Sequence, residues 1–135
     1  MINDNFILLD SDILIKQDVS ELFNENYIYV SEVLIQGNGI KRVAPFLCYI
    51  NVQMCKENNI NYFDERYMHG LSNNSSDMYD TGGAFYVNSQ NYVHKNIKIN
   101  DYAIHYGHGS WVRNGYNYQL SPEEFFEKYK EYWNI

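Results

Sequence analysis

The stretch that decides the fold is Phe6-Ile7-Leu8-Leu9-Asp10-Ser11-Asp12, an apolar run that ends in two aspartates separated by one serine. A short apolar run bounded by polar residues is typical of a buried strand. We therefore expect a strand over residues 5–9 that brings Asp10 and Asp12 to its carboxyl end. Ligands of open α/β sheets bind at the carboxyl ends of strands. The stretch predicts an α/β domain with a functional site directly after its first strand.

A second apolar run, over residues 101–106, also stops at polar groups and contains His105. Carboxylates at one strand end and an imidazole at another can share one divalent cation. We therefore expect Asp10, Asp12 and His105 to be ligands of Mn²⁺ or Mg²⁺. Structural readings stay open, because the aspartates can form a solvated turn and His105 can be a hydrogen-bonded core residue. His108, between two glycines, is either a further ligand or an ordinary loop residue.

A third candidate site is the motif Asp80-Thr81-Gly82-Gly83. Two glycines after a carboxylate predict a tight turn that could hold Asp80 near a bound substrate. There Asp80 would contact a substrate hydroxyl or act as a general base. The structural alternative is an Asx turn that opens a strand.

The composition limits the class of protein. The 135 residues fit one domain spanning 1–135, and the formal net charge of -7 argues against binding to nucleic acid or to an anionic membrane. An anionic ligand would need a cation or local basic groups such as Lys41, Arg42 and Arg66. No apolar stretch approaches the roughly 20 residues of a membrane span. The N-terminus does not resemble a secretory signal, so we expect a cytoplasmic protein.

Hydrophobic periodicity, together with turn-forming and helix-capping residues, predicts the remaining elements. Strands are expected over residues 27–30, 33–35, 60–63 and 84–87, and a polar loop over 70–80. A short helix over 18–23 would be capped by Asp18, with Glu21 completing a capping box. A longer helix over 45–57 would begin at Pro45, end in a left-handed cap at 58–59, and hold Cys48 and Cys55 too far apart for a disulfide. The C-terminal helix would begin at Ser121, with an aromatic face that must dock on the rest of the chain.

Three of these motifs resemble one known family. Residues 8–15, followed by 18–23, resemble the Asp-x-Asp region of bacterial glycosyltransferases of the A-type fold. Tyr79-Asp80-Thr81-Gly82-Gly83-Ala84-Phe85 looks like the acceptor-side turn of these enzymes. Ala103-Ile104-His105-Tyr106-Gly107-His108-Gly109-Ser110-Trp111 is similar to their Ile-His-x-x-x-Gly-Ser-Trp ending. The resemblance covers most of residues 5–112, and the order and spacing of the motifs make it specific.

The resemblance implies an α/β fold, with a mixed sheet and flanking helices, that looks like the second half of such an enzyme. It implies metal-dependent transfer of a sugar from a nucleotide-sugar donor to a hydroxyl acceptor, for example a cell-surface polysaccharide or similar glycan. Asp10, Asp12 and His105 would hold Mn²⁺ or Mg²⁺, and Asp80 would bind the acceptor or act as the catalytic base. The donor would be bound by the following residues: Asp10, Ser11, Asp12, Gly107, Ser110 and Trp111.

The chain departs from the family at its N-terminus. Members usually carry a nucleotide-binding α/β half before Asp-x-Asp, whereas only nine residues precede Asp10 here. We therefore expect a truncated transferase-like domain with an exposed sheet edge, which a partner or a second copy would cover. Two alternatives stay open. One is a non-catalytic remnant that acts as a dimerising interaction module; the other is a Zn²⁺ hydrolase that uses His105, His108 and a carboxylate.

Overall fold

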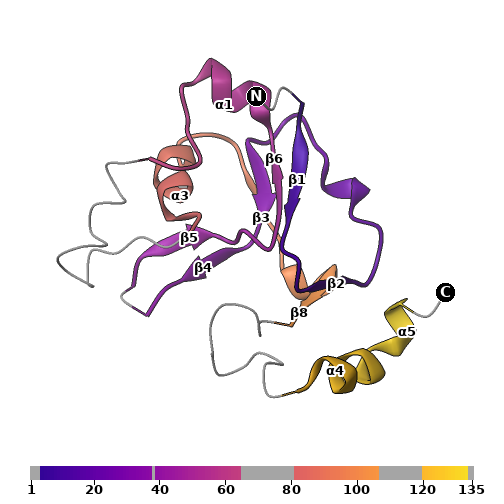
Figure 1. The fold of residues 1–135 in the computed structure, drawn as a ribbon. Helices are drawn as coiled ribbons and strands as arrows, with labels where there is room; N and C mark the ends of the chain where they lie inside the picture. Colours follow the sequence, from indigo (N-terminus) through magenta and orange to yellow (C-terminus); the bar gives the residue numbers. More distant parts are fainter. Residues whose placement is uncertain (1–3, 38, 65–80, 107–119, 134–135) are drawn as a thin grey trace.

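The structure, a computed structural model, describes residues 4–37, 39–64, 81–106 and 120–133. Its largest sheet has the strand order β1-β6-β3-β7 (Figure 1). The strands are β1 (Phe6–Leu9), β6 (Leu47–Ile50), β3 (Tyr29–Ser31) and β7 (Lys95–Asn96). β6 runs antiparallel to both β1 and β3, whereas β3 and β7 are parallel. The expected α/β class with a mixed sheet is therefore confirmed.

Strand β1 forms where the sequence predicts it. It pairs with β6 in the register Phe6↔Ile50 to Leu9↔Leu47, and the backbone N–H of Asp10 extends the pairing to the carbonyl of Phe46. Among the described residues β1 pairs with β6 alone, so it lies at an edge of the sheet. The expected sheet edge is thus present at β1 among the described residues, whereas its coverage by a partner stays a prediction.

Strand β6 corrects the helix expected over residues 45–57. Leu47–Ile50 lies between β1 and β3, and all four of its residues are buried. A strand buried on both faces has a continuous apolar run, which periodicity cannot distinguish from a buried helix. Only the second half of the expected helix forms, as α1 (Val52–Glu57). Its N-cap is Asn51, whose side chain accepts a hydrogen bond from the N–H of Met54.

The expected left-handed cap of this helix is present. Asn59 has a φ of 53°, and the N–H of Ile60 donates to the carbonyl of Cys55, as in a Schellman motif. The strand expected over 60–63 is wrong, because Ile60 completes this cap and residues 61–64 form no ladder. Cys48 and Cys55 are free, but they lie on β6 and α1 instead of on one helix.

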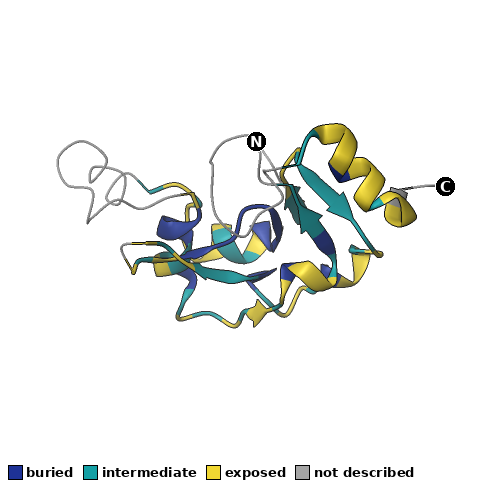
Figure 2. Ribbon diagram, turned by 90° about the horizontal axis from the view of Figure 1, so that it is seen from below, coloured by how far each residue is buried: buried dark blue, intermediate teal, exposed yellow. Residues whose placement is uncertain are grey.

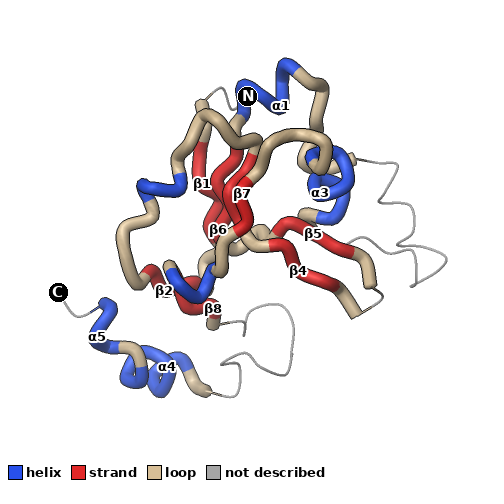
Figure 3. The backbone as a smooth tube through the Cα atoms, turned by 180° about the vertical axis from the view of Figure 1, so that it is seen from behind, coloured by secondary structure: helices blue, strands red, loops and turns tan. Residues whose placement is uncertain are grey.

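Two smaller antiparallel ladders flank the main sheet (Figure 3). The first pairs β2 (Ile13–Ile15) with β8 (Ala103–His105), and the second pairs β4 (Val33–Ile35) with β5 (Lys41–Val43). The strand expected over 33–35 is β4 with the same bounds, and the strands expected over 27–30 and 101–106 appear as β3 and β8 with different ends. Short 3-10 turns precede β3 and β8, at η1 (Ser20–Leu22) and η4 (Ile99–Asp101).

Two local predictions need correction. The capping box of Asp18 and Glu21 does not form; Asp18 accepts a hydrogen bond from the N–H of Ser20 instead, and only one 3-10 turn follows. The strand expected over 84–87 is the helix α3 (Gly83–Ser89). The aromatic and β-branched residues of this segment favour a strand by propensity. Packing of Phe85 into the core stabilises the helix instead, and the buried Ser89 hydroxyl is satisfied by donating to the Phe85 carbonyl.

The C-terminal helix begins as predicted. Ser121 and Glu124 form a reciprocal capping box at the start of α4 (Pro122–Lys128), and α5 (Lys130–Trp133) follows after one residue. The expected docking holds in part: Phe125 is buried, whereas Phe126 and Tyr132 remain exposed. Figure 2 shows the largely exposed outer surface of these two helices.

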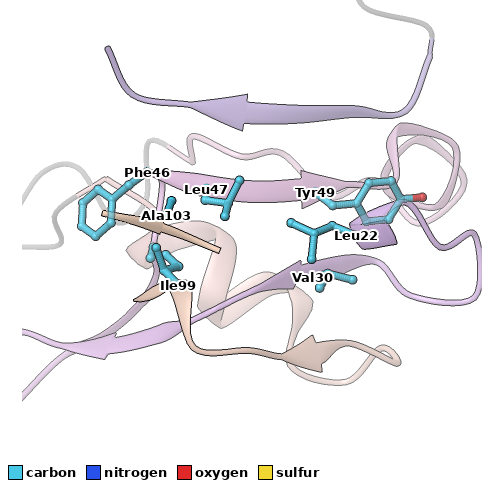
Figure 4. Packing of buried hydrophobic residues seen from close by; sticks show 8 residues of the cluster. Leu22, Val30, Phe46, Leu47, Tyr49, Ile99 and Ala103 are labelled. Carbon is cyan, nitrogen blue, oxygen red and sulfur yellow. The ribbon is translucent and has the colours of Figure 1, made fainter. Parts of the chain in front are cut away.

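Two clusters of buried side chains form the core. The first cluster lies along β6, with Phe46 beside Ala103 and Ile99 at one end and Tyr49 at the other (Figure 4). The second contains Tyr29, Cys48 and Phe85 and packs under α1 and α3. Of the helices that the structure describes, none has the length and apolar character needed to cross a membrane.

Candidate metal centre

The Asp-Ser-Asp segment is the link between two ladders. Asp10 follows β1, and its N–H donates to the Phe46 carbonyl at 3.1 Å. Asp12 precedes β2, and its carbonyl accepts a hydrogen bond from the N–H of Tyr106 at 2.8 Å. Both ends of this three-residue link are therefore held by backbone hydrogen bonds. The two carboxylates are presented from a fixed backbone, as a ligand site requires.

Pairing of β2 with β8 brings His105 to the same place. His105 is the last residue of β8 and lies opposite Ile13. Its Nε2 lies 3.1 Å from Oδ1 of Asp12, and the two side chains are 14% and 23% exposed. Because a carboxylate only accepts hydrogen bonds, Nε2 is the donor in this contact. The predicted meeting of Asp12 and His105, which are 93 positions apart, is present in the structure.

Asp10, Asp12 and His105 together have the dimensions of a metal site. One ligand atom from each side chain lies within 4.8 Å of the other two. Ligand atoms at about 2.1 Å from one ion are roughly 3 Å apart when adjacent and roughly 4.2 Å apart when opposite. The three side chains therefore need little movement to reach a common ion. The two carboxylates suit Mg²⁺ or Mn²⁺, and the imidazole is a ligand typical of transition-metal ions.

Phe46 and Arg42 border this cluster, and the sequence did not point to Phe46. The Phe46 ring stacks on the imidazole of His105, with the ring centroids 4.2 Å apart and the planes at 21°. The guanidinium carbon of Arg42 lies 5.6 Å from the centroid of the Phe46 ring. Arg42, one of the expected local basic groups, is only 5% exposed. Phe46 can be identified as a neighbour of the centre only when its pairing with Asp10 is known. The helix expected over 45–57 excluded that pairing.

Tyr106 joins the centre to the C-terminal helices. Its ring packs on Phe125 with centroids 4.7 Å apart, and its hydroxyl donates to the carbonyl of Leu120. Desolvation, together with the carboxylates of Glu123 and Glu124, raises the pKa of Tyr106. The hydroxyl is therefore a neutral donor at physiological pH. Helix α4 supports the residue that directly follows His105.

The described part of the Asp80 motif has a structural role. Gly82, with a φ of 89°, is the N-cap of α3, and its carbonyl accepts hydrogen bonds from the N–H groups of Val43 and Tyr86. Arg42 donates a hydrogen bond to the Thr81 carbonyl at 3.3 Å. This turn is therefore connected through Arg42 and Phe46 to His105. Asp80 itself lies outside the described residues.

The other predicted site residues divide into two groups. Ser11 is exposed between the two aspartates, and Lys41 is exposed at the start of β5. The remaining ones lie outside the described residues: Arg66, Asp80, Gly107, His108, Ser110 and Trp111. The predicted role of Asp80, and the donor-binding roles of Gly107, Ser110 and Trp111, stay predictions.

Comparison with known proteins found no match for the chain among family models, curated proteins or solved structures.

Proposed function

We propose that the chain is a glycosyltransferase-like protein that binds Mn²⁺ or Mg²⁺ and, through it, the diphosphate of a nucleotide-sugar. The observation that supports this most is the approach of Asp10, Asp12 and His105 to within 4.8 Å of one another. The order of the sequence motifs supports the same class. The acceptor would be a hydroxyl group of a glycan.

Each residue has a defined part in this proposal. Asp10 and Asp12 supply two carboxylates, which repel each other until a cation lies between them. His105 would supply a neutral nitrogen ligand in the tautomer that carries its proton on Nδ1, which leaves Nε2 free to bind the ion. The bound cation would stabilise the negative charge of the departing nucleoside diphosphate. Asp80 would orient or deprotonate the acceptor hydroxyl.

The test is calorimetric titration of the whole chain with UDP, GDP and their sugar conjugates, with and without Mn²⁺. We expect nucleotide binding that weakens about tenfold or more when Mn²⁺ is removed or Asp12 is replaced by alanine. Asp4→Ala is the matched control, because it removes one exposed carboxylate near the same terminus. Binding that is unchanged by Asp12→Ala, or equally weak in Asp4→Ala, would refute the metal bridge.

The edge position of β1 supports a second candidate function, a module that pairs with a second copy of itself. The four residues of β1 are apolar and uncharged, and such an edge can add another strand. Light scattering would then give the mass of a dimer. Leu9→Lys, at a 47% exposed position on β1, should shift it to monomer. Ile35→Lys on β4, where the side chain is 69% exposed, should leave the dimer intact. A monomer at every concentration refutes the module.

A further inference from the structure

Phe46 contacts both segments that carry the candidate ligands. Its carbonyl accepts the backbone hydrogen bond of Asp10 at 3.1 Å, and its ring stacks on the imidazole of His105 at 4.2 Å. Asp10 and His105 belong to different ladders, so few residues can touch both. Phe46 is 8% exposed and packs in the core cluster along β6, so its own position is well fixed.

Stacking restricts how the imidazole can turn. An aromatic ring packed on one face of His105 blocks side-chain rotations that would drive the imidazole into that ring, and the stacked arrangement itself is favourable. In the observed orientation, Nε2 faces Oδ1 of Asp12 at 3.1 Å. A swing of the imidazole away from Asp12 would lose both the stack and this hydrogen bond. The ring of Phe46 therefore fixes the plane of the imidazole, and the hydrogen bond to Asp12 selects the flip in which Nε2 faces the carboxylate.

Arg42 also contacts the ring of Phe46. Its guanidinium packs 5.6 Å from the centroid of the Phe46 ring and donates to the carbonyl of Thr81. A cation over an aromatic ring is attracted to it, more strongly when it is buried, as Arg42 is. The Phe46 ring is thus held by a contact independent of His105.

We infer that Phe46 is a positioning residue, whose ring holds the imidazole of His105 ready for a divalent cation. The inference rests on the proposed metal centre. Phe46 has no ligand atom in its side chain, but in this role it would still affect how tightly the cation binds. Support of a ligand by its neighbours commonly changes metal affinity by about 10- to 100-fold.

The experiment compares Mn²⁺ affinity in the wild type, Phe46→Leu and Phe46→Tyr. Leucine keeps an apolar side chain without the ring, whereas tyrosine restores the ring. The backbone carbonyl that holds Asp10 stays in both variants. We expect Phe46→Leu to weaken Mn²⁺ binding about tenfold or more, and Phe46→Tyr to recover most of that loss. Phe85→Leu is the matched control, since it removes a buried ring from the other core cluster.

Three results would overturn the inference: wild-type affinity in Phe46→Leu, no recovery in Phe46→Tyr, or an equal loss in Phe85→Leu. Urea unfolding curves show which variants are folded. Phe46→Met replaces Phe46→Leu if the leucine variant does not fold.

A second readout separates this inference from the proposed function. Nitrogen NMR of the metal-free protein reports which ring nitrogen of His105 carries the proton, with His105→Gln for assignment. We expect a protonated Nε2 in the wild type and in Phe46→Tyr, and a mixture of both tautomers in Phe46→Leu. If the wild type binds no Mn²⁺, the proposed function fails. The NMR comparison of the wild type with the two Phe46 variants then tests the positioning role of Phe46 by itself. An unchanged His105 signal in Phe46→Leu overturns the inference.

Discussion

At the scale of single residues, Gly82 has no room for a side chain. Its φ is 89°, and a Cβ atom there would overlap the carbonyl oxygen of Val43. Both the backbone conformation and the contact with β5 exclude alanine. We expect Gly82→Ala to lower the free energy of unfolding by about 3 kcal/mol or more, measured by urea denaturation.

Gly37→Ala is the control for this substitution. A Cβ on Gly37 meets no atom within 4 Å, so the free energy of unfolding should change by less than about 0.5 kcal/mol. Equal losses in the two variants would show that the glycines act through general chain flexibility. The close approach of Gly82 to Val43 would then have no special cost.

Cys48 predicts how stability depends on alkaline pH. Burial raises the pKa of its thiol from 9.0 to about 12. Above pH 9 the unfolded chain loses this proton while the folded protein keeps it, so the unfolded state is favoured as pH rises. The stabilising contribution is complete below the unfolded pKa and declines above it, by up to about 1.4 kcal/mol per pH unit.

Unfolding in urea at about pH 8 and about pH 10.5 measures this effect. In the wild type the free energy of unfolding should fall between the two conditions, and in Cys48→Ala the fall should be about 2 kcal/mol smaller. Tyrosines titrate in both proteins and cancel in the comparison. Identical falls in the two proteins would show that the Cys48 thiol does not contribute.

At the scale of elements, α4 depends on its first turn. The Ser121 hydroxyl accepts a hydrogen bond from the N–H of Glu124 at 3.1 Å, and the Glu124 carboxylate accepts one from the N–H of Ser121 at 2.8 Å. Ser121→Ala should cost about 1 kcal/mol of stability, measured by urea denaturation. Because the two bonds belong to one motif, the double variant with Glu124→Ala should lose less than the sum of the single losses.

Glu123→Ala provides the comparison, since it removes a carboxylate from the same turn without touching the capping box. Its combination with Ser121→Ala should be additive. Equal coupling energies for Glu123 and Glu124 would mean that charge near the helix end matters, and not the reciprocal pair of hydrogen bonds.

Some elements with local signals were predictable, although the capping box expected at Asp18 does not form, and elements defined by their neighbours were not predictable. The cap at Ser121 and the acidic end of β1 are encoded within a few residues, so both were found. The segment at 47–50 is apolar throughout, and only its position between β1 and β3 makes it a strand. Residues 84–87 have strand propensity, but the left-handed backbone of Gly82 and the packing of Phe85 make them helical.

The residues of the candidate centre could be predicted from the sequence, but the residues that pack around them could not. Polar groups that end apolar runs indicate Asp10, Asp12 and His105 without knowledge of the fold. The stack of Phe46 on His105 depends on the register of β1 against β6, which a single sequence does not reveal. Arg42 could be named as a nearby basic group, but its burial against Phe46 could not be predicted.

At the scale of the whole molecule, a cation at this centre would join the link between β1 and β2 to the end of β8. An ion that binds the folded state but not the unfolded chain raises stability by about 2.7 kcal/mol when its free concentration is about 100 times its dissociation constant. We therefore expect Mn²⁺ to raise the melting temperature and excess EDTA to reverse the rise. Scanning calorimetry measures both.

Asp12→Ala should show no such rise with Mn²⁺, whereas Asp4→Ala should respond as the wild type does. A rise of equal size in both variants would place the bound ion elsewhere on this acidic protein.

The separation of 93 positions between Asp12 and His105 has a consequence for synthesis in the cell. A ribosome that adds 5–20 residues per second needs roughly 5–20 s to travel from one to the other. For most of that interval the aspartates are outside the ribosome while their histidine has not yet been made. A nascent chain that stops before β8 therefore has the first half of the centre and no means to complete it. The proposed ion site can therefore be completed only late in translation, after most of the polypeptide has been made.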